Sequence, residues 1–424
     1  MANKPDRLNL RSYQVGFGDC YLLSFRYPSG ERHVLVDCGS TGKPAGVPAK
    51  LLTHVAKDIA LRCGNKLHAV VATHRHQDHV NGFATAINGK GPGDVIAACK
   101  PDVVIQPWTE DPDAEPDAGK PITALTASEA RVRALSDMNR FSESVVHEAS
   151  RLRAHSGAVG TRLAGQLAFL GEDNIKNLSA VKNLMKMGKR NRYVFFGSKS
   201  GLESVLPGVK TSVLGPPTPE QHAEVRKQRD KDDAEFWHFQ AASARRHLEN
   251  ASPPFRSPRV LGSVPPSARW FVPRLLGIRA DQLLQIVRSL DDAMNNTSVI
   301  LLFEIGTKSL LFPGDAQIEN WEYALSKPAV RQKLAKVNLY KVGHHGSLNA
   351  TPKSLWKLFA NRGTSTHSKL QTLVSTMAGK HGHVDNDSEV PRRKLVNALR
   401  AETSYFSTQD LKKTELFRDF EIAL

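Results

Sequence analysis

The feature that most constrains this chain is a group of metal-ligand side chains behind a short apolar run. Residues 67–72 have the composition of a buried strand, and the segment after them leads through a loop to Gly82. Within six positions this loop contains His74, His76, Asp78 and His79. Because α/β proteins place their chemistry at the carboxyl ends of strands, the sequence predicts a functional site here.

The spacing of these four side chains indicates metal binding. His74 and His76 are alternate residues and can point to the same side, whereas Asp78 and His79 follow after a turn. Two imidazoles suit one divalent ion, and an adjacent carboxylate and imidazole suit a second ion nearby. The alternative is a polar loop that happens to hold several of the chain's 16 histidines. Four ligand side chains in so short a stretch favour the metal site.

This stretch resembles the signature of the metallo-β-lactamase superfamily, His-x-His-x-Asp-His, which the chain matches without a substitution. The resemblance implies an α/β fold, a four-layer αββα sandwich, with one or two Zn²⁺ ions along one edge. It also implies that further ligands follow later in the chain.

Two earlier motifs narrow the resemblance to one branch of the superfamily. Val-Gly-Phe-Gly-Asp at residues 15–19 and Leu-Val-Asp-Cys-Gly at residues 35–39 resemble the branch that contains the hydrolase domain of the bacterial competence DNA-uptake channel. In the superfamily an aspartate at the position of Asp37 lies behind the metal site, so we expect Asp37 to orient a histidine. A simple turn aspartate is the alternative.

The second half of the sandwich is expected from two apolar strands that form a hairpin and end at Leu-Phe-Pro-Gly-Asp, residues 311–315. The resemblance implies that Asp315 bridges both ions. A later strand, residues 337–342, ends in Gly-His-His-Gly-Ser. Its register against the superfamily favours His345 as a ligand of the second ion and leaves His344 to contact substrate or move a proton. The opposite assignment stays open.

The expected superfamily site is incomplete in one respect. A third histidine of the first ion should precede Asp315, but Leu-Gly-Pro-Pro occupies the expected place at residues 214–217. The first ion would then be held by His74, His76, Asp315 and water. Mn²⁺ or Mg²⁺ therefore becomes an alternative to Zn²⁺, although two imidazoles favour zinc.

The chain of 424 residues is longer than one sandwich of this kind needs. We expect a single domain over residues 1–424, with inserted, largely helical or loop segments at 84–192 and 218–294. The net charge of +16 would attract a polyanion. The strongest local candidates for nucleic-acid contact form a basic run without an acidic residue: Lys182, Lys186, Lys189, Arg190 and Arg192. A solvated helix face is the alternative.

The sequence therefore predicts a metal-dependent hydrolase, a phosphodiesterase or nuclease that acts on DNA or RNA through a metal-activated hydroxide. In this hypothesis Asp78 holds the second ion and accepts a proton, and His344 or Ser347 meets the developing negative charge. One alternative is a hydrolase of small esters, lactones or phosphoesters, and another is a nucleic-acid-binding protein with little turnover.

The expected location is cytoplasmic, without a membrane partner. The N-terminus has no apolar segment typical of a signal peptide, and no apolar run approaches the roughly 18 residues that a membrane span needs. The four cysteines have no Cys-x-x-Cys spacing, so buried, reduced thiols are expected.

Overall fold

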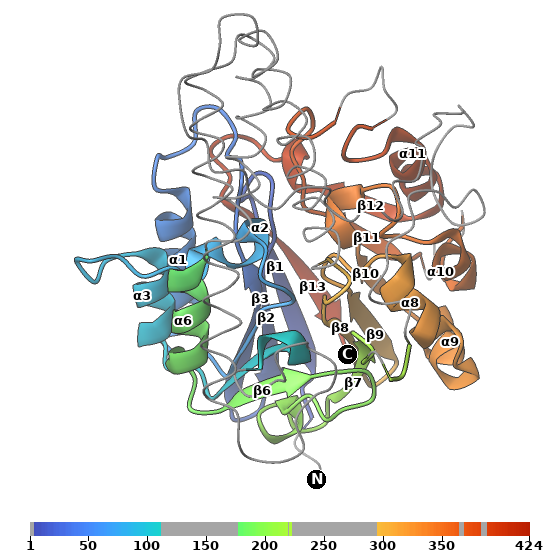
Figure 1. Cartoon of the computed structure of the whole chain (residues 1–424), viewed down its shortest axis with the longest axis horizontal. Helices are drawn as coiled ribbons and strands as arrows, with labels where there is room; N and C mark the ends of the chain where they lie inside the picture. Colours follow the sequence, from blue (N-terminus) through green and yellow to red (C-terminus); the bar gives the residue numbers. More distant parts are fainter. Residues whose placement is uncertain (1–3, 112–176, 219, 223–294, 364–368, 383–387) are drawn as a thin grey trace, which may run out of the picture.

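A computed structural model of the chain describes residues 4–111, 177–218, 220–222, 295–363, 369–382 and 388–424. Within these residues two sheets stand face to face, with helices outside each of them (Figure 1). The fold is therefore the αββα sandwich that the sequence predicts. No helix of the described part is long and apolar enough to cross a membrane.

The first sheet is built from the N-terminal part of the chain and closed by its C-terminal strand. Its order is β13-β1-β2-β3-β4-β5-β6, with β3 to β6 parallel. The strands are β1 (Arg7–Tyr13), β2 (Cys20–Tyr27), β3 (Gly30–Cys38), β4 (Ala69–Val71), β5 (Val103–Pro107), β6 (Asn191–Val194) and β13 (Phe417–Ala423).

The second sheet has the order β12-β11-β10-β9-β8-β7, in which β9 to β12 are parallel. A hairpin joins β8 to β9, as the sequence predicts. The strands are β7 (Lys210–Gly215), β8 (Ile300–Ile305), β9 (Lys308–Phe312), β10 (Leu339–Lys341), β11 (Gln371–Val374) and β12 (Ser404–Ser407).

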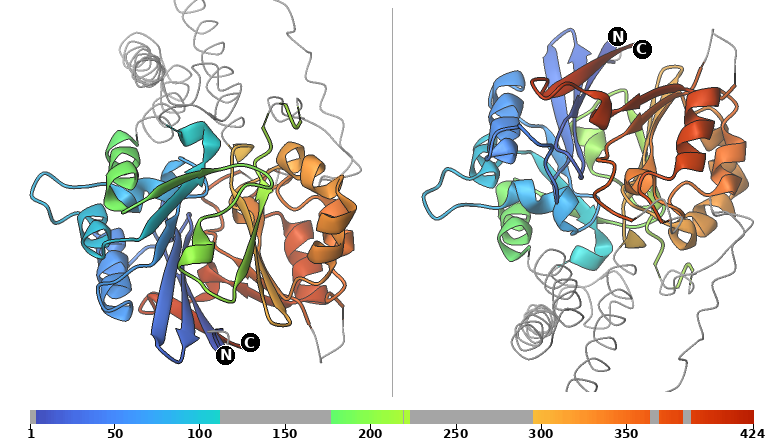
Figure 2. Two further views of the ribbon diagram at one scale, coloured as in Figure 1. Left: turned by 90° about the horizontal axis from the view of Figure 1, so that it is seen from below. Right: turned by 90° about the horizontal axis from the view of Figure 1, so that it is seen from above.

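Helices cover the outer face of each sheet (Figures 1 and 2). The first sheet carries α1 (Leu51–Arg62), α3 (Pro92–Ala98) and α6 (Leu178–Met187), and the short α2 (Gln77–Val80) lies at its edge. The second sheet carries α8 (Ile318–Leu325), α9 (Pro328–Ala335), α10 (Lys353–Leu358) and α11 (Arg393–Glu402).

Alternation along the strands explains why both faces of each sheet are buried. In β2 the side chains of Tyr21, Leu23 and Phe25 enter the core between the two sheets. Those of Cys20 and Leu22 enter the core under α1 and α3. Successive strand residues point to opposite faces, so a strand between two apolar layers is nearly continuously hydrophobic. All four cysteines are buried and free.

The structure differs from the sequence-based expectations in one helical segment and in two strands. The sequence pattern of residues 320–335 predicts one helix, but the structure has two, because Pro328 cannot continue α8 and instead starts α9. Strands β12 and β13 were not predicted. Strand β13 pairs antiparallel with β1 along its whole length, which places both ends of the chain side by side (Figure 2).

Part of the expected insertion at residues 84–192 belongs to the first half of the sandwich. Helices α3 and α6 pack on the outer face of the first sheet, and β5 lies between β4 and β6 in that sheet. The acidic residues and prolines of the segment 111–120 predict a loop, but nearly all of it lies outside the described residues, as does most of the segment 218–294. The division into a domain and two insertions therefore stays a prediction.

A buried histidine away from the metal-ligand cluster predicts acid sensitivity. His33 lies on β3, and its ring forms a hydrogen bond with the hydroxyl of Ser24. Burial lowers the pKa of His33 to about 4. The unfolded chain binds a proton near pH 6.5 that the folded chain does not, so stability is complete above that pH and is lost as pH falls towards 4. We expect a loss of up to about 3 kcal/mol from this group. Urea unfolding at pH 7 and pH 5 should show a smaller pH effect in His33→Gln than in the unchanged protein, and an equal effect would contradict this.

Candidate metal centre

The predicted ligands converge where strands of both sheets end. His74 and His76 follow β4, and Asp78 and His79 lie on α2 directly behind them. From the second sheet, Asp315 follows β9, and His344 and His345 follow the neighbouring parallel strand β10. Since β3 and β4 are also parallel neighbours, the carboxyl ends of four strands meet at this edge.

Four side chains form the tightest cluster: Asp78, His79, Asp315 and His345. Their donor atoms all lie within 4.8 Å of one another. The distance from His79 Nε2 to Asp315 Oδ2 is 3.1 Å, and that from His345 Nε2 to Asp78 Oδ2 is 3.0 Å. Three of the side chains are at most 1% exposed, whereas Asp78 is 13% exposed. The cluster therefore opens to solvent on the Asp78 side.

The first pair of histidines lies beside this cluster. His74 is buried, and its Nε2 is 4.0 Å from Asp315 Oδ2. The ring of His76 lies 4.6 Å from that of His74, centre to centre. His344 Nε2 approaches the same Asp315 oxygen to 3.9 Å. Oδ2 of Asp315 thus faces imidazoles from both sheets, His74 after β4 and His344 after β10.

Hydrogen bonds behind the cluster fix two of its imidazoles. Asp37 accepts from His79 Nδ1 at 2.9 Å and from the backbone N–H of Thr73 at 2.7 Å. This is the position behind the site that the resemblance implies. His345 donates from Nδ1 to the carbonyl oxygen of Ser375 at 2.8 Å. In both rings Nε2 is left to face the cluster, as metal-binding histidines require.

Three residues of the site have a strained backbone conformation. Asp37, His344 and His345 have φ values of 56°, 43° and 53°, in the left-handed region that non-glycine residues rarely adopt. Such residues cluster at functional sites. Gly39 has a different role, because a Cβ there would lie 2.3 Å from the backbone carbon of Asp78. Its missing side chain lets the end of β3 pack against the ligand loop.

The charge states suit cation binding. Burial lowers the pKa of His74 well below its ordinary value and lowers that of His344 to about 4, so both rings are neutral at pH 7. Burial opposes ionisation of Asp315, but the surrounding histidines hold its pKa well below the usual range. Burial opposes protonation of His79 and His345 as well, but Asp315 and other nearby carboxylates raise the pKa of both rings above the ordinary value. Because divalent ions bind neutral imidazoles and charged carboxylates, metal binding would release protons from these two rings.

These residues fit a divalent metal. The buried Nε2 of His74 finds no hydrogen-bond partner among the described residues, although such atoms are normally paired. Nitrogen and oxygen donors in this mixture suit Zn²⁺ and also allow Mn²⁺. A metal ion would satisfy the orphaned nitrogen and offset the charges of the clustered carboxylates.

The described residues do not supply the third histidine of the first ion at the expected place. Leu214 and Gly215 end β7 there, and His222 instead lies 3.4 Å from Glu322 on α8. The other histidines of the expected insertions lie outside the described residues. His381 packs on Phe17 with ring centres 4.4 Å apart, and Phe17 packs equally closely on His345.

Sequence reasoning missed two buried ion pairs at the centre. Arg75, between the two histidines of the motif, donates to both carboxylate oxygens of Glu110 at 2.8 and 2.5 Å. Lys341, at the end of β10, contacts the buried carboxylate of Asp19. The only available signal was position: Asp19 ends the glycine-rich motif, and Lys341 lies three residues before His344.

The basic run is exposed but lies largely away from the cluster. Lys182 and Lys186 are on the outer side of α6. Lys189 and Arg190 precede β6, at the edge of the parallel strands opposite to the one that carries His74. An acidic residue also comes close, since Lys189 Nζ is 2.8 Å from Asp102. Contact between this run and nucleic acid stays a prediction.

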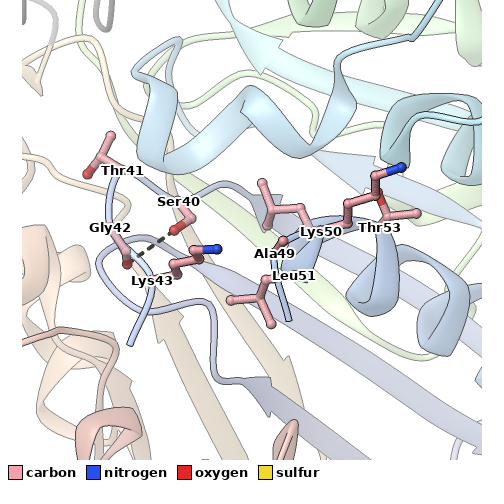
Figure 3. A pocket seen from close by; sticks show the side chains of 9 residues that line it. Ser40, Thr41, Gly42, Lys43, Ala49, Lys50, Leu51 and Thr53 are labelled. Atoms are coloured by element: carbon pink, nitrogen blue, oxygen red, sulfur yellow. Dashed lines mark hydrogen bonds between the residues drawn. The ribbon is translucent and has the colours of Figure 1, made fainter. Parts of the chain in front are cut away.

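A pocket of about 320 Å³ lies between the loop at residues 40–43 and the start of α1 (Figure 3). Lys43 and Lys50 are among the residues that line it. Its wall is joined to the cluster through Phe17, whose backbone pairs with Gly42 and whose ring packs on His345. The pocket is therefore a neighbour of the candidate metal centre.

Comparison with known proteins agrees with the fold and the cluster. The model of the metallo-beta-lactamase superfamily matches residues 13–98, a segment that contains both N-terminal motifs and the ligands on and before α2. A search of curated proteins found no match. The family match, the sandwich and the converging donors together indicate a metal-dependent hydrolase.

Proposed function

We propose that this protein is a metal-dependent phosphodiesterase that cleaves nucleic acid, with DNA as the first candidate substrate. The observation that carries the proposal is the convergence of Asp78, His79, Asp315 and His345 from two sheets onto one buried point. The donors of such a cluster suit a divalent ion better than any structural role, because buried charges are otherwise costly.

Ions held there would stabilise charge on a phosphoryl oxygen and activate a water nucleophile. The residues His74, His76 and Asp315 would hold the first ion, and the cluster around Asp315 the second. Substrate would enter on the side of Asp78 and His344, the exposed rim of the centre. This arrangement needs no protein nucleophile.

His344 is suited to meet the substrate. Its side chain is 27% exposed, and its Nδ1 finds no hydrogen-bond partner among the described residues. Burial keeps its pKa at about 4, so the neutral ring can donate one N–H to a phosphoryl oxygen near pH 7. Asp78, the most exposed carboxylate of the cluster, is placed to accept a proton from the attacking water.

A polyanionic substrate is supported by charge. The chain carries 58 lysines and arginines against 42 acidic residues. Lys43 and Lys50 border the pocket beside the centre, where they would attract a phosphate of the substrate next to the scissile bond. The resemblance of residues 15–19 and 35–39 to the DNA-uptake branch supports DNA, and a cytoplasmic role without a membrane partner fits that proposal.

The test is incubation of the purified protein with linear, circular and single-stranded DNA and with RNA, in the presence of Zn²⁺, Mn²⁺ or Mg²⁺. We expect cleavage that a chelator stops and that falls steeply with added salt. The paired control is His344→Gln, which should cleave more slowly while keeping its metal. Turnover of a simple ester or lactone without any cleavage of nucleic acid would replace the proposal with a small-molecule hydrolase.

A further inference from the structure

A buried ammonium lies directly behind the candidate metal centre. Lys341 is 2% exposed, and its Nζ contacts the carboxylate of the fully buried Asp19. It also donates to the carbonyl oxygen of Gly314 at 3.2 Å and lies 3.6 Å from Asp315 Oδ1. Its neighbours are thus two carboxylates and a carbonyl oxygen, the acceptors that suit a buried ammonium.

The pair touches the ligands from behind. Asp19 lies 3.7 Å from Nδ1 of His79 and 3.7 Å from Nδ1 of His345. Asp19, Asp37 and His79 also form a second group of donors whose atoms are close enough to hold a cation. The ammonium of Lys341 already occupies the surroundings of Asp19. It therefore supplies the positive charge beside this carboxylate.

The two oxygens of Asp315 have different partners. Oδ1 accepts from the backbone N–H of His344 at 3.1 Å and faces the Lys341 ammonium. Oδ2 faces the imidazole nitrogens of the cluster, the nearest being His79 Nε2 at 3.1 Å. Without a cation on the Oδ1 side, only the N–H of His344 would fix the plane of the carboxylate. The group could then turn partly about its Cβ–Cγ bond, and Oδ2 would no longer face the imidazole nitrogens.

We propose that Lys341, with Asp19 as its counter-charge, is a positioning residue that holds Oδ1 of Asp315 and so directs Oδ2 to the metal ions. The inference rests on the proposed metal centre. It gives a role to a lysine and an aspartate whose burial is unfavourable unless they are paired.

A double variant separates positioning from simple charge. Lys341→Met with Asp19→Asn removes one positive and one negative charge, so the net charge of the buried centre is unchanged. Its long-range attraction for a cation stays the same, and no buried carboxylate is left without its ammonium. The contact between the ammonium and Asp315 Oδ1 is lost, whereas the hydrogen bond from the His344 N–H to that oxygen remains. The amide of Asp19→Asn keeps the shape of the group that lies beside His79 and His345.

The experiment uses Co²⁺ as the probe, because its visible absorption reports the geometry and number of its ligands. We expect the double variant to bind Co²⁺ about 10–100-fold more weakly than the unchanged protein, as for other changes behind metal ligands, and to give an altered spectrum. Thermal unfolding of the metal-free proteins checks that each one folds. Lys341→Leu with Asp19→Asn gives the same test if the methionine form does not fold.

An affinity within about twofold of the unchanged protein and an identical spectrum would overturn the positioning role, because second-layer changes normally cost far more. A different failure belongs to the proposed function. If the unchanged protein itself binds no Co²⁺, the metal centre is wrong and this inference is wrong with it. If it binds Co²⁺ but cleaves no nucleic acid, the substrate assignment fails and the positioning role is still tested.

Discussion

Asp315→Asn should reduce metal-dependent hydrolysis by at least about 10³-fold, because Lewis-acid stabilisation is worth several kcal/mol. Asp315 Oδ2 is the atom that faces His74, His79 and His345, so an amide there weakens the hold on both ions. The amide oxygen can still accept the backbone N–H of His344, which Asp315 Oδ1 accepts in the unchanged protein. The fold should therefore persist.

The measurement is kcat/KM together with metal content after dialysis. Asp94→Asn is the matched control, because Asp94 caps α3 and takes no part in the cluster. It should retain the activity and the metal of the unchanged protein. Full activity in Asp315→Asn, with its metal still bound, would remove Asp315 from the centre.

Glu110→Gln should destabilise the fold by about 3–5 kcal/mol, the usual cost of breaking a buried ion pair from one side. The Arg75 and Glu110 side chains are 12% and 6% exposed, and the change removes the carboxylate that Arg75 grips with two hydrogen bonds. Since Arg75 lies between His74 and His76, the same change should also loosen the first ion. Urea unfolding and metal affinity measure the two effects.

The matched control is the double variant Arg75→Met with Glu110→Met, which leaves no buried charge behind. Replacing a whole buried pair by apolar side chains is often close to neutral, so the double variant should be more stable than Glu110→Gln alone. If the free energy of unfolding of Glu110→Gln lies within about 0.5 kcal/mol of that of the unchanged protein, as for an ordinary surface substitution, the pair does not anchor the ligand loop.

The sandwich and most of the centre could be predicted because their signals are local. Apolar runs shortly before residues 37, 74, 315 and 344 identify strands and place these polar side chains at the carboxyl ends of the strands. The spacing of the motif then sets which side chains share a face. These features depend on near neighbours, which a sequence displays directly.

The missed features depend on partners far apart in the chain. Lys341 sits in an apolar strand, but only the fold shows that Asp19, more than three hundred residues earlier, makes its burial tolerable. Arg75 follows β4 and Glu110 follows β5, and they form their ion pair because these two strands are parallel neighbours. Strand β13 alternates charged and apolar residues as an edge strand does, yet its partner β1 is at the other end of the sequence. Tertiary pairing, not local pattern, decides these cases.

The most direct test of the metal centre is the number of ions that the metal-free protein takes up. The protein is loaded with excess Zn²⁺, freed of unbound ions by gel filtration, and analysed for metal per chain. We expect about two ions per chain, as in two-metal hydrolytic sites, and the loss of these ions in Asp315→Asn. A protein that retains no Zn²⁺, and none of Mn²⁺ or Co²⁺ under the same treatment, would contradict it.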